Sequence, residues 1–239
     1  MKVIVVPDVH GRVLWKKAKE YSCPVIFLGD YLDPYVDYDN ITQEESIKNF
    51  KEILEYARNN SNVHLLLGNH DMTYVIGRNI CHCRALEVYY NEVRKLFIDN
   101  IDIFSLAHRE VINDKLYLFT HAGISKFWCD IHKDVFNHSY EEVLRDYDFS
   151  TSCLSDKDFV STLRDVSYWR GGYEDTGSMI WIDVREWPIM EPEVKDVVQV
   201  FGHTYSNHER HFNSFTECHM LDDGKTIDGI EEDGSILII

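Results

Sequence analysis

Three short, mainly apolar segments in the first third of the chain have the pattern of buried strands. They cover residues 2–6, 25–28 and 63–67. Apolar runs of this length are typical of strands that are buried on both faces. Between the second and third segments, apolar side chains recur at helical spacing after Thr42, and Glu45 stands three residues on, as in a capping box. A shorter helix is expected over residues 12–21. This alternation predicts a parallel sheet covered by helices.

The pattern changes after a further helix, which apolar spacing predicts over residues 84–99. Residues 103–112 and 115–120 are expected to form a hairpin around the turn-forming pair Asn113 and Asp114. The second half of the chain is therefore expected to be richer in β-structure than the first.

Two short helices are predicted within residues 139–166, with caps at Ser139 and Ser155. Strands are expected near residues 179–184, 197–201, 210–216 and 235–239. The chain has no linker, internal repeat or low-complexity tract that would divide it. We therefore predict a single domain over residues 1–239.

Composition narrows the class of protein. Hydrophobic residues make up 44% of the 239 residues and charged residues 27%, which is ordinary for a globular protein. No apolar run approaches the ~18 residues that a membrane span needs, and the first residues do not resemble a signal peptide, so we expect a cytoplasmic protein with no membrane contact. A net charge of −17 repels phosphate backbones and makes nucleic acid an unlikely partner. An anionic substrate would then need local positive charge, for which a metal is the obvious source.

Five short polar segments combine carboxylate, imidazole and amide side chains. They are Asp8-Val9-His10-Gly11, Gly29-Asp30, Gly68-Asn69-His70-Asp71, His121-Ala122-Gly123 and Gly202-His203. The first three directly follow predicted parallel strands, whose carboxyl ends converge on one crevice in open α/β sheets. Asp8 and His10 are two residues apart, so an extended backbone would direct both to one side. Mixed oxygen and nitrogen ligands of this kind favour Mn²⁺, Fe or Zn²⁺.

The order and spacing of these motifs resemble the calcineurin-like metallophosphoesterase superfamily. The stretches DVHG, GDYLD and GNHD are most similar to its serine/threonine protein phosphatase branch, of the bacterial and phage type. The resemblance covers the chain from residue 8 to about residue 205. It implies an α/β fold, a four-layer α/β/β/α sandwich of two mixed sheets, with a dinuclear metal site at one edge.

The resemblance also implies a role for each motif residue. It implies six metal ligands: Asp8, His10, Asp30, Asn69, His121 and His203. Asp30 would bridge two ions that lie about 3.5–4 Å apart in sites of this kind. A hydroxide between the ions would attack phosphorus, and His70, oriented by Asp33, would protonate the leaving oxygen. We expect Mn²⁺ to support activity in vitro, with Fe or Zn²⁺ as alternatives.

Two departures from the family pattern bear on the substrate. Pro34 stands where the phosphatase branch usually has a phosphate-gripping arginine, so we expect Arg170, in an Arg-Gly-Gly loop, to bind phosphate instead. Arg78 and Arg185 are alternatives. Tyr205 stands where many diesterases of the superfamily have a second histidine, which favours phosphate monoesters as substrates.

These expectations combine into a metal-dependent phosphatase acting on a phosphoprotein or a small phosphoester. A nucleotide or dinucleoside polyphosphate hydrolase and a phosphodiesterase or nuclease are alternatives on the same site. The complete ligand set disfavours a non-catalytic scaffold. The aromatic residues near the Arg170 loop are expected to pack within the protein or to stack on a nucleoside: Trp169, Tyr173, Trp181 and Trp187. The sequence leaves the physiological substrate, the native metal and the oligomeric state open.

Overall fold

The computed structural model describes most of the chain in two compact units, which divide between Ser105 and Leu106. The described residues are 3–35, 40–77, 83–186, 194–204, 210–212 and 217–220. Several features named above lie outside them: Arg78, Trp187, Tyr205 and the strand expected over residues 235–239.

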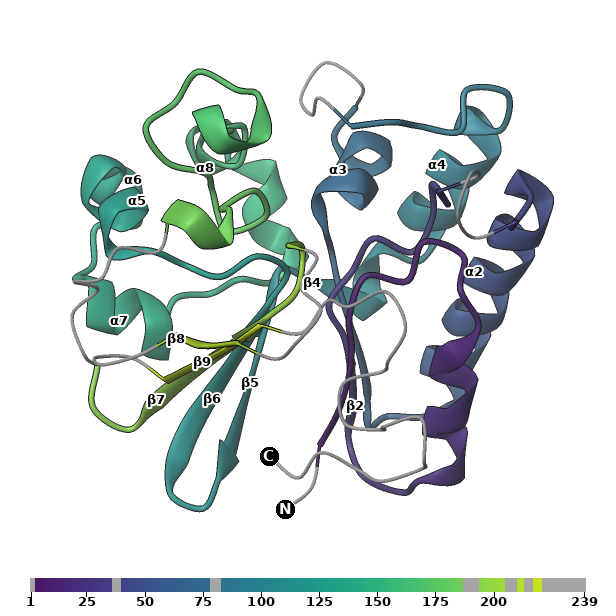
Figure 1. The fold of residues 1–239 in the computed structure, drawn as a ribbon, viewed down its shortest axis with the longest axis horizontal. Coiled ribbons are helices and arrows are strands. Elements are labelled where there is room, and N and C mark those ends of the chain that lie inside the picture. The colour runs from purple at the N-terminus through teal and green to yellow at the C-terminus, as the bar shows by residue number, and fades with distance from the viewer. Residues whose placement is uncertain are drawn as a thin grey trace. The chain divides into compact units, whose positions relative to one another are not determined.

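The first unit is built on a parallel sheet in the order β1-β2-β3-β4 (Figure 1). Its strands are β1 (Ile4–Val6), β2 (Val25–Phe27), β3 (Val63–Leu66) and β4 (Phe104–Ser105). Nearly all their side chains are buried, which explains why the sequence shows mainly apolar runs instead of alternation. The three predicted strands are confirmed. The single strand expected over 103–112 is instead two strands, since β4 pairs with β3 and the remainder belongs to the second unit.

Helices cover the first sheet. They are η1 (Leu14–Glu20), α2 (Gln43–Asn59), α3 (Asn69–Val75), α4 (Tyr90–Asp99) and η2 (Ile101–Ile103), where η marks a 3-10 helix. The predicted capping box is confirmed, because Thr42 Oγ1 accepts from the Glu45 N–H at 3.2 Å and Glu45 Oε2 accepts from the Thr42 N–H at 2.9 Å. The helix expected over 84–99 begins only at Tyr90. The residues before it make tertiary bonds instead, such as Leu86 N–H to the Tyr74 hydroxyl.

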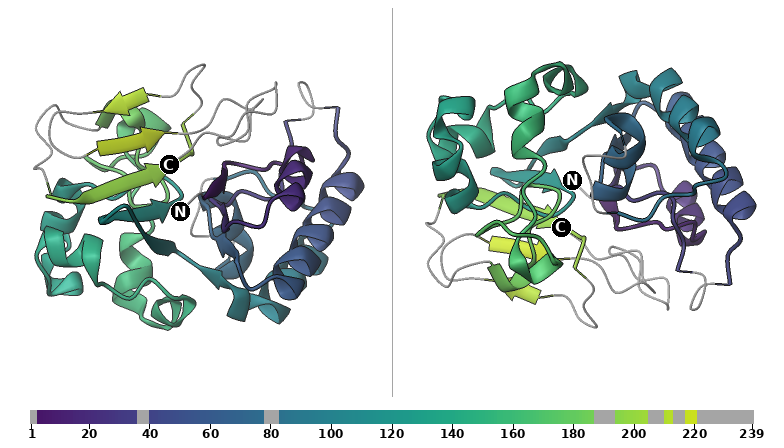
Figure 2. Two further views of the ribbon diagram at one scale, coloured as in Figure 1. Left: turned by 90° about the horizontal axis from the view of Figure 1, so that it is seen from below. Right: turned by 90° about the horizontal axis from the view of Figure 1, so that it is seen from above.

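The core of the first unit is strongly aromatic. Phe50 of α2, Phe97 of α4 and Phe104 of β4 pack together, with 4.7 Å between the Phe50 and Phe97 ring centroids. Tyr31, which follows β2, joins the same cluster. Helices α2 and α4 accordingly lie on the same side of the sheet (Figure 2). Burying each such ring contributes roughly 1.5–3 kcal/mol, so the cluster holds the helices on the sheet and fixes the strand ends.

The second unit contains a mixed sheet in the order β5-β6-β7-β9-β8. Its strands are β5 (Ala107–Ile112), β6 (Lys115–Thr120), β7 (Val197–Phe201), β8 (Arg210–Phe212) and β9 (Glu217–Met220). The predicted hairpin is confirmed as β5 and β6, with Asn113 and Asp114 at φ 50° and 65° as a tight turn of this hand needs. Strands β6, β7 and β9 run parallel, and β8 is antiparallel to β9.

Short helices lie beside this second sheet (Figure 1). They are α5 (Lys126–Ile131), α6 (Lys133–Phe136), α7 (Tyr140–Arg145), η3 (Thr151–Ser155), α8 (Lys157–Thr162), η4 (Tyr168–Arg170) and η5 (Val184–Glu186). The cap predicted at Ser139 is confirmed. The cap predicted at Ser155 is wrong by one residue, because the Asp156 carboxylate accepts the first N–H groups of α8.

The strand expected near residues 179–184 is wrong. Trp181 N–H and Ile182 N–H both donate to the carbonyl of Ser178, so the segment is a turn that leads into η5. Its apolar residues are buried nonetheless, and Ile182 packs with Ala122 and Phe201. A compact apolar turn and a short buried strand give the same pattern in the sequence.

The α/β fold class is confirmed. Of the two mixed sheets expected, the second is mixed, whereas the described strands of the first are all parallel. The single domain stays a prediction. None of the helices in the described part of the chain combines the length and the apolar character that a bilayer crossing requires.

Candidate active site

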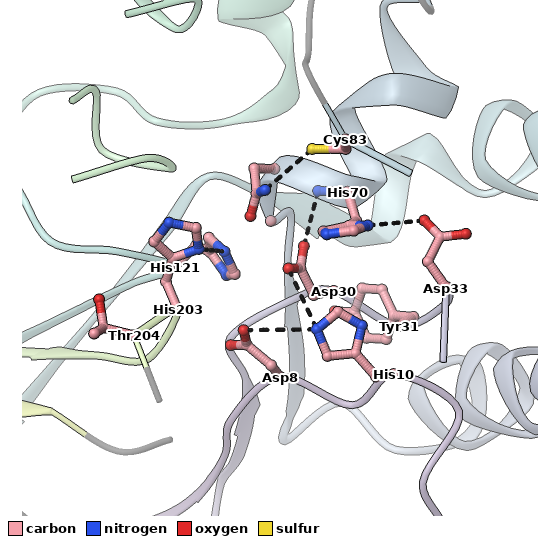
Figure 3. Close-up of polar contacts among 12 residues, drawn as sticks. Asp8, His10, Asp30, Tyr31, Asp33, His70, Cys83, His121, His203 and Thr204 are labelled. Carbon is pink, nitrogen blue, oxygen red and sulfur yellow. Dashed lines mark hydrogen bonds and ion pairs between the residues drawn. The ribbon is translucent and has the colours of Figure 1, made fainter. Parts of the chain in front are cut away.

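The first unit brings five of the predicted site residues to the carboxyl ends of its parallel strands (Figure 3). Asp8 and His10 follow β1, Asp30 follows β2, and Asn69 and His70 begin α3 directly after β3. All five side chains are buried. The His10 Nε2 atom lies 3.9 Å from Asp8 Oδ2 and 3.8 Å from Asp30 Oδ2. The parallel topology therefore assembles these groups as the strand order predicts.

Asp8 and His10 lie close together for a different reason from the extended backbone that their spacing predicted. The His10 backbone is left-handed, with φ 43°, so the two side chains do not converge along an extended strand. Instead the chain turns sharply after Asp8, and His10 N–H donates to the Asp30 carbonyl at 2.7 Å. Asp30 is itself left-handed, with φ 50°. Such conformations are uncommon outside glycine and concentrate at functional sites.

The hydrogen bonds of His10 define which of its ring nitrogens can act as a ligand. Its Nδ1 lies 2.9 Å from the carbonyl oxygen of Leu32, which can only accept, so Nδ1 carries the hydrogen. Nε2 of the neutral ring then presents a lone pair toward Asp8 and Asp30. A second partner that fixes the tautomer in this way is typical of metal-bound histidines.

The electrostatics of the same group are unfavourable without a cation. Burial, followed by the charge of His70, lowers the pKa of His10 well below its usual value. Burial, followed by the charges of Asp8 and Asp71, raises the pKa of Asp30 well above its usual value. Both shifts disfavour the charged forms, as expected when buried carboxylates face each other without a positive partner. A metal ion would supply that charge, and the oxygen and nitrogen donors fit Mn²⁺, Fe or Zn²⁺.

Asp71 is a supporting residue to which the sequence analysis assigned no role. Its carboxylate accepts the backbone N–H groups of Asp30 at 2.7 Å, Gly68 at 2.8 Å and Tyr31 at 3.2 Å. These bonds join the loop after β2 to the loop after β3. The two loops approach so closely that a Cβ atom on Gly29 would lie 2.4 Å from the Gly68 nitrogen. Asp71 is the third residue of α3, and Gly68, which precedes that helix, has no side chain to cap it. An acidic residue at this position favours the start of a helix, and it was the one sequence signal that pointed to Asp71.

His70 and Asp33 form the expected pair. His70 Nδ1 lies 3.0 Å from Asp33 Oδ2, and both residues are buried. An ionised carboxylate can only accept, so Nδ1 carries the hydrogen and Nε2 is the nitrogen available to a substrate. The backbone N–H of His70 also donates to Asp30 Oδ1 at 2.9 Å, which ties the predicted proton donor to a predicted metal ligand.

The second unit brings together the two remaining predicted ligands. His121 follows β6 and His203 follows β7, and these strands are parallel neighbours. His121 Nε2 lies 3.0 Å from His203 Nδ1, and both rings are buried. Two imidazole nitrogens at this distance share a hydrogen, or present two lone pairs to one cation. The two histidines are therefore suited to binding a metal ion, as are the carboxylates of Asp8 and Asp30 in the first unit.

Arg170 lies close to His203 but is already bonded. Its Nη2 donates to Thr204 Oγ1 at 2.7 Å and to the His203 carbonyl at 3.1 Å, and its Nε pairs with Asp183 Oδ2 at 2.9 Å. Burial acts to raise the pKa of Asp183, but hydrogen bonds from Arg185 and both guanidinium charges lower it below its usual value. Arg170 therefore holds the loop of His203 in place. Its contact with phosphate stays a prediction.

A family model described as calcineurin-like phosphoesterase matches residues 1–214, and the chain belongs to that family. The resemblance carried by the motifs is therefore confirmed, together with the α/β fold that it implies. The protein is a hydrolase that acts on phosphoesters, and its buried aspartate and histidine side chains could bind metal.

Several solved structures resemble the chain. A cold-active protein-tyrosine phosphatase of a psychrophilic Shewanella species is 20% identical, and the match covers 92% of this chain and 70% of that one with a TM-score of 0.46. An archaeal phosphodiesterase is 13% identical, and the match covers 93% of this chain and 84% of that one with a TM-score of 0.33. No curated protein matches the chain.

Proposed function

We propose that the protein is a phosphatase that hydrolyses phosphate monoesters with the help of two metal ions. The orientation of the His10 ring is the observation that carries this proposal. Because Nδ1 is bonded to the Leu32 carbonyl, Nε2 faces the carboxylates of Asp8 and Asp30 at 3.8–3.9 Å. Three buried electron-rich groups in this arrangement repel one another unless a cation lies among them.

The ligands divide between two ions. Asp8, His10 and Asp30 would hold the first, and Asp30 would also contact the second. The family resemblance adds Asn69, His121 and His203 as ligands of the second ion, and the last two are paired in the structure. When bound, the two ions neutralise the phosphate and lower the pKa of a water so that it can attack phosphorus. We propose Mn²⁺ for activity in vitro, because oxygen and nitrogen ligands in this mixture suit it.

His70 would protonate the oxygen of the leaving group. Its Nδ1 is held by Asp33 at 3.0 Å, so the ring cannot rotate away and Nε2 delivers the proton. A positioned acid of this kind contributes about 10²–10⁴-fold to the rate of proton-limited steps.

The leaving group gives the sharpest test of these roles. In Mn²⁺-loaded protein, His70→Asn should keep its metal and lose most activity on alkyl or phosphoseryl esters, but less on nitrophenyl phosphate. The nitrophenolate anion is stable without a proton, so it needs little acid catalysis. Asp33→Asn should show the same selectivity more weakly. His132→Asn is the matched control, because His132 also pairs with an aspartate, Asp165, but lies outside the proposed site.

Two results would contradict the proposal. If His70→Asn lost equal activity on both kinds of leaving group, or lost its metal, His70 would not be the general acid. Aryl phosphate monoesters should also be hydrolysed faster than the matching diesters under the same conditions. A clear reversal of that order would make the protein a phosphodiesterase.

One observation favours a nucleotide as the phosphate monoester. Trp169 and Tyr173 are 55% and 81% exposed, on the loop that Arg170 ties to His203. Trp181 is buried against the His203 ring, and the Trp169 ring packs against the Arg185 guanidinium at 4.7 Å, whereas Tyr173 is the most exposed of the three. Exposed aromatic rings can stack on a base, which contributes about 1–3 kcal/mol. Trp169→Ala should then raise KM for nucleoside monophosphates and leave KM for ribose 5-phosphate unchanged.

A further inference from the structure

The carboxylate of Asp33 is held from both sides. Its Oδ2 faces His70 Nδ1 at 3.0 Å, and its Oδ1 accepts a hydrogen bond from the Tyr74 hydroxyl at 2.8 Å. The Asp33 and Tyr74 side chains are both buried. Arg84 also contacts Asp33, but it donates to the backbone carbonyl at 3.0 Å and not to the carboxylate. Tyr74 is therefore the second group that orients the partner of His70.

The direction of the Tyr74 hydrogen bond is determined by a third group. The backbone N–H of Leu86 donates to the Tyr74 hydroxyl oxygen at 2.8 Å, so the single hydroxyl hydrogen is free to point at Asp33. Burial, followed by the charge of Asp33, raises the pKa of the Tyr74 phenol, which therefore keeps its hydrogen. Three donors therefore form one chain of hydrogen bonds. The backbone N–H of Leu86 donates to the Tyr74 oxygen, and the Tyr74 O–H and the ring Nδ1–H of His70 both donate to the Asp33 carboxylate.

The ring of Tyr74 has little freedom to move. It stacks on Phe97 with 5.8 Å between centroids and packs against Tyr90 at 5.5 Å. Phe97 belongs to the aromatic core described above, which anchors Tyr74 to the centre of the first unit. The terminal torsion of an aspartate, by contrast, is broad and roughly two-fold when nothing constrains it. A fixed hydroxyl at Oδ1 therefore keeps Oδ2 directed at His70.

We propose that Tyr74 is a positioning residue for proton donation by His70, acting through Asp33. This inference rests on the proposed function, in which His70 protonates the leaving oxygen. Without the hydroxyl, the Asp33 carboxylate loses one of its two oriented donors and can rotate. The bond from His70 Nδ1 to Asp33 then becomes longer and less directional, and the His70 ring is less well oriented.

The chain offers a closely matched pair of variants. Tyr74→Phe removes the hydroxyl that contacts Asp33. Tyr90→Phe removes a hydroxyl from a ring that packs against Tyr74 but donates to the Thr73 carbonyl at 3.1 Å, away from Asp33. Both variants keep the ring and its packing, so a difference between them reports on the two bonds of the Tyr74 hydroxyl, to Asp33 and from the Leu86 N–H. The double-mutant cycle with Asp33→Asn then isolates the bond to Asp33. Thermal unfolding checks that both are folded.

Two measurements test the proposal, and the first needs no activity. In metal-free protein at a fixed pH, the NMR signal of the His70 Nδ1 proton should shift in Tyr74→Phe and stay unchanged in Tyr90→Phe. In Mn²⁺-loaded protein, Tyr74→Phe should lower kcat on an alkyl phosphate about tenfold and on nitrophenyl phosphate less than about threefold, a part of the full effect of a positioned acid. Metal content should be unchanged.

A double-mutant cycle separates positioning from a general loss of structure. Adding Tyr74→Phe to Asp33→Asn should cost nothing further in leaving-group selectivity, because the hydroxyl acts only through the carboxylate. Additive losses, equal losses on both leaving groups, or an unshifted His70 proton would overturn the inference. If the wild-type protein hydrolyses no phosphoester, the proposed function fails, while the NMR comparison still decides whether Tyr74 orients the pair.

Discussion

Replacing Asp71 should destabilise the first unit more than any exposed substitution, because this carboxylate satisfies three buried N–H groups. Asp71→Ala leaves the N–H groups of Asp30, Gly68 and Tyr31 without their acceptor. It also releases the loop whose left-handed turn at Asp30 places a predicted metal ligand. The variant should therefore lose both stability and metal.

The magnitude follows from the number of bonds. Each buried N–H without a partner costs about 1–3 kcal/mol, and a water that enters the vacated space would lower that cost, so we expect a total of about 3–5 kcal/mol. Asp71→Asn keeps an oxygen for the two shortest bonds and turns a donor toward the Tyr31 N–H, so we expect about 1–2 kcal/mol. A whole domain is stable by only about 5–15 kcal/mol, so the alanine variant should be close to unfolding.

Urea denaturation of metal-free protein measures these differences directly. Glu45→Ala, which removes an exposed carboxylate from the cap of α2, is the control and should lose far less than Asp71→Ala. Mn²⁺ binding by Asp71→Asn should be weaker than that of the wild type. A loss below about 1 kcal/mol for the alanine variant would show that the three bonds contribute little, which would refute the reasoning.

Three further outcomes are expected. Protein prepared with Mn²⁺ should contain two metal ions per chain by elemental analysis, and Asp30→Asn should lose both more readily than Asn69→Ala; a folded protein with no metal would end the dinuclear proposal. Burial raises the pKa of Asp30, and raises that of Asp71 to about 8. The folded, metal-free protein then holds protons that the unfolded chain has released, whereas the lowered pKa of His10 acts in the opposite direction below about pH 6.5. The Tm should therefore fall as pH rises from about 6.5 to about 8, and a Tm that rises across this range would contradict the shift of Asp71. Burial, with the charge of a nearby aspartate, raises the pKa of the Cys153 thiol to about 12, so alkylation at pH 8 should label it much more slowly in folded than in urea-unfolded protein. Equal labelling rates would contradict that shift.

Local signals in the sequence predicted those elements that local interactions determine. The strands before Asp8, Asp30 and Asn69, the capping box at Thr42 and the turn at Asn113 depend on a few neighbouring residues, and all are present. Helix α3 was not predicted, because its seven residues are all buried and show no amphipathic pattern. Its formation depends on tertiary bonds, above all those that Asp71 makes.

In the candidate site, too, some contacts follow from local sequence and others depend on how distant segments pack. Motifs placed Asp8, His10 and Asp30 together because strand ends of a parallel sheet converge. Nothing in the sequence placed Tyr74 against Asp33, because that contact depends on how α3 packs over the sheet. The contacts of Arg170 could not be predicted either, because they depend on how its loop folds against Asp183 and the loop of His203.

The backbone of the site explains why these residues act together. His10, Asp30, Asp33 and His203 all adopt left-handed conformations, with φ between 43° and 68°. Each such residue costs roughly 1–2 kcal/mol relative to a right-handed one. The bonds of Asp71 and the His10 N–H bond to the Asp30 carbonyl offset that cost within the first unit. Glycine would relieve the strain at any of these positions but would remove a predicted metal ligand or, at Asp33, the partner of His70. In the proposed mechanism the supporting bonds therefore matter to activity as well as to stability, because they let the proposed ligands and the partner of His70 occupy turns that glycine would otherwise fill.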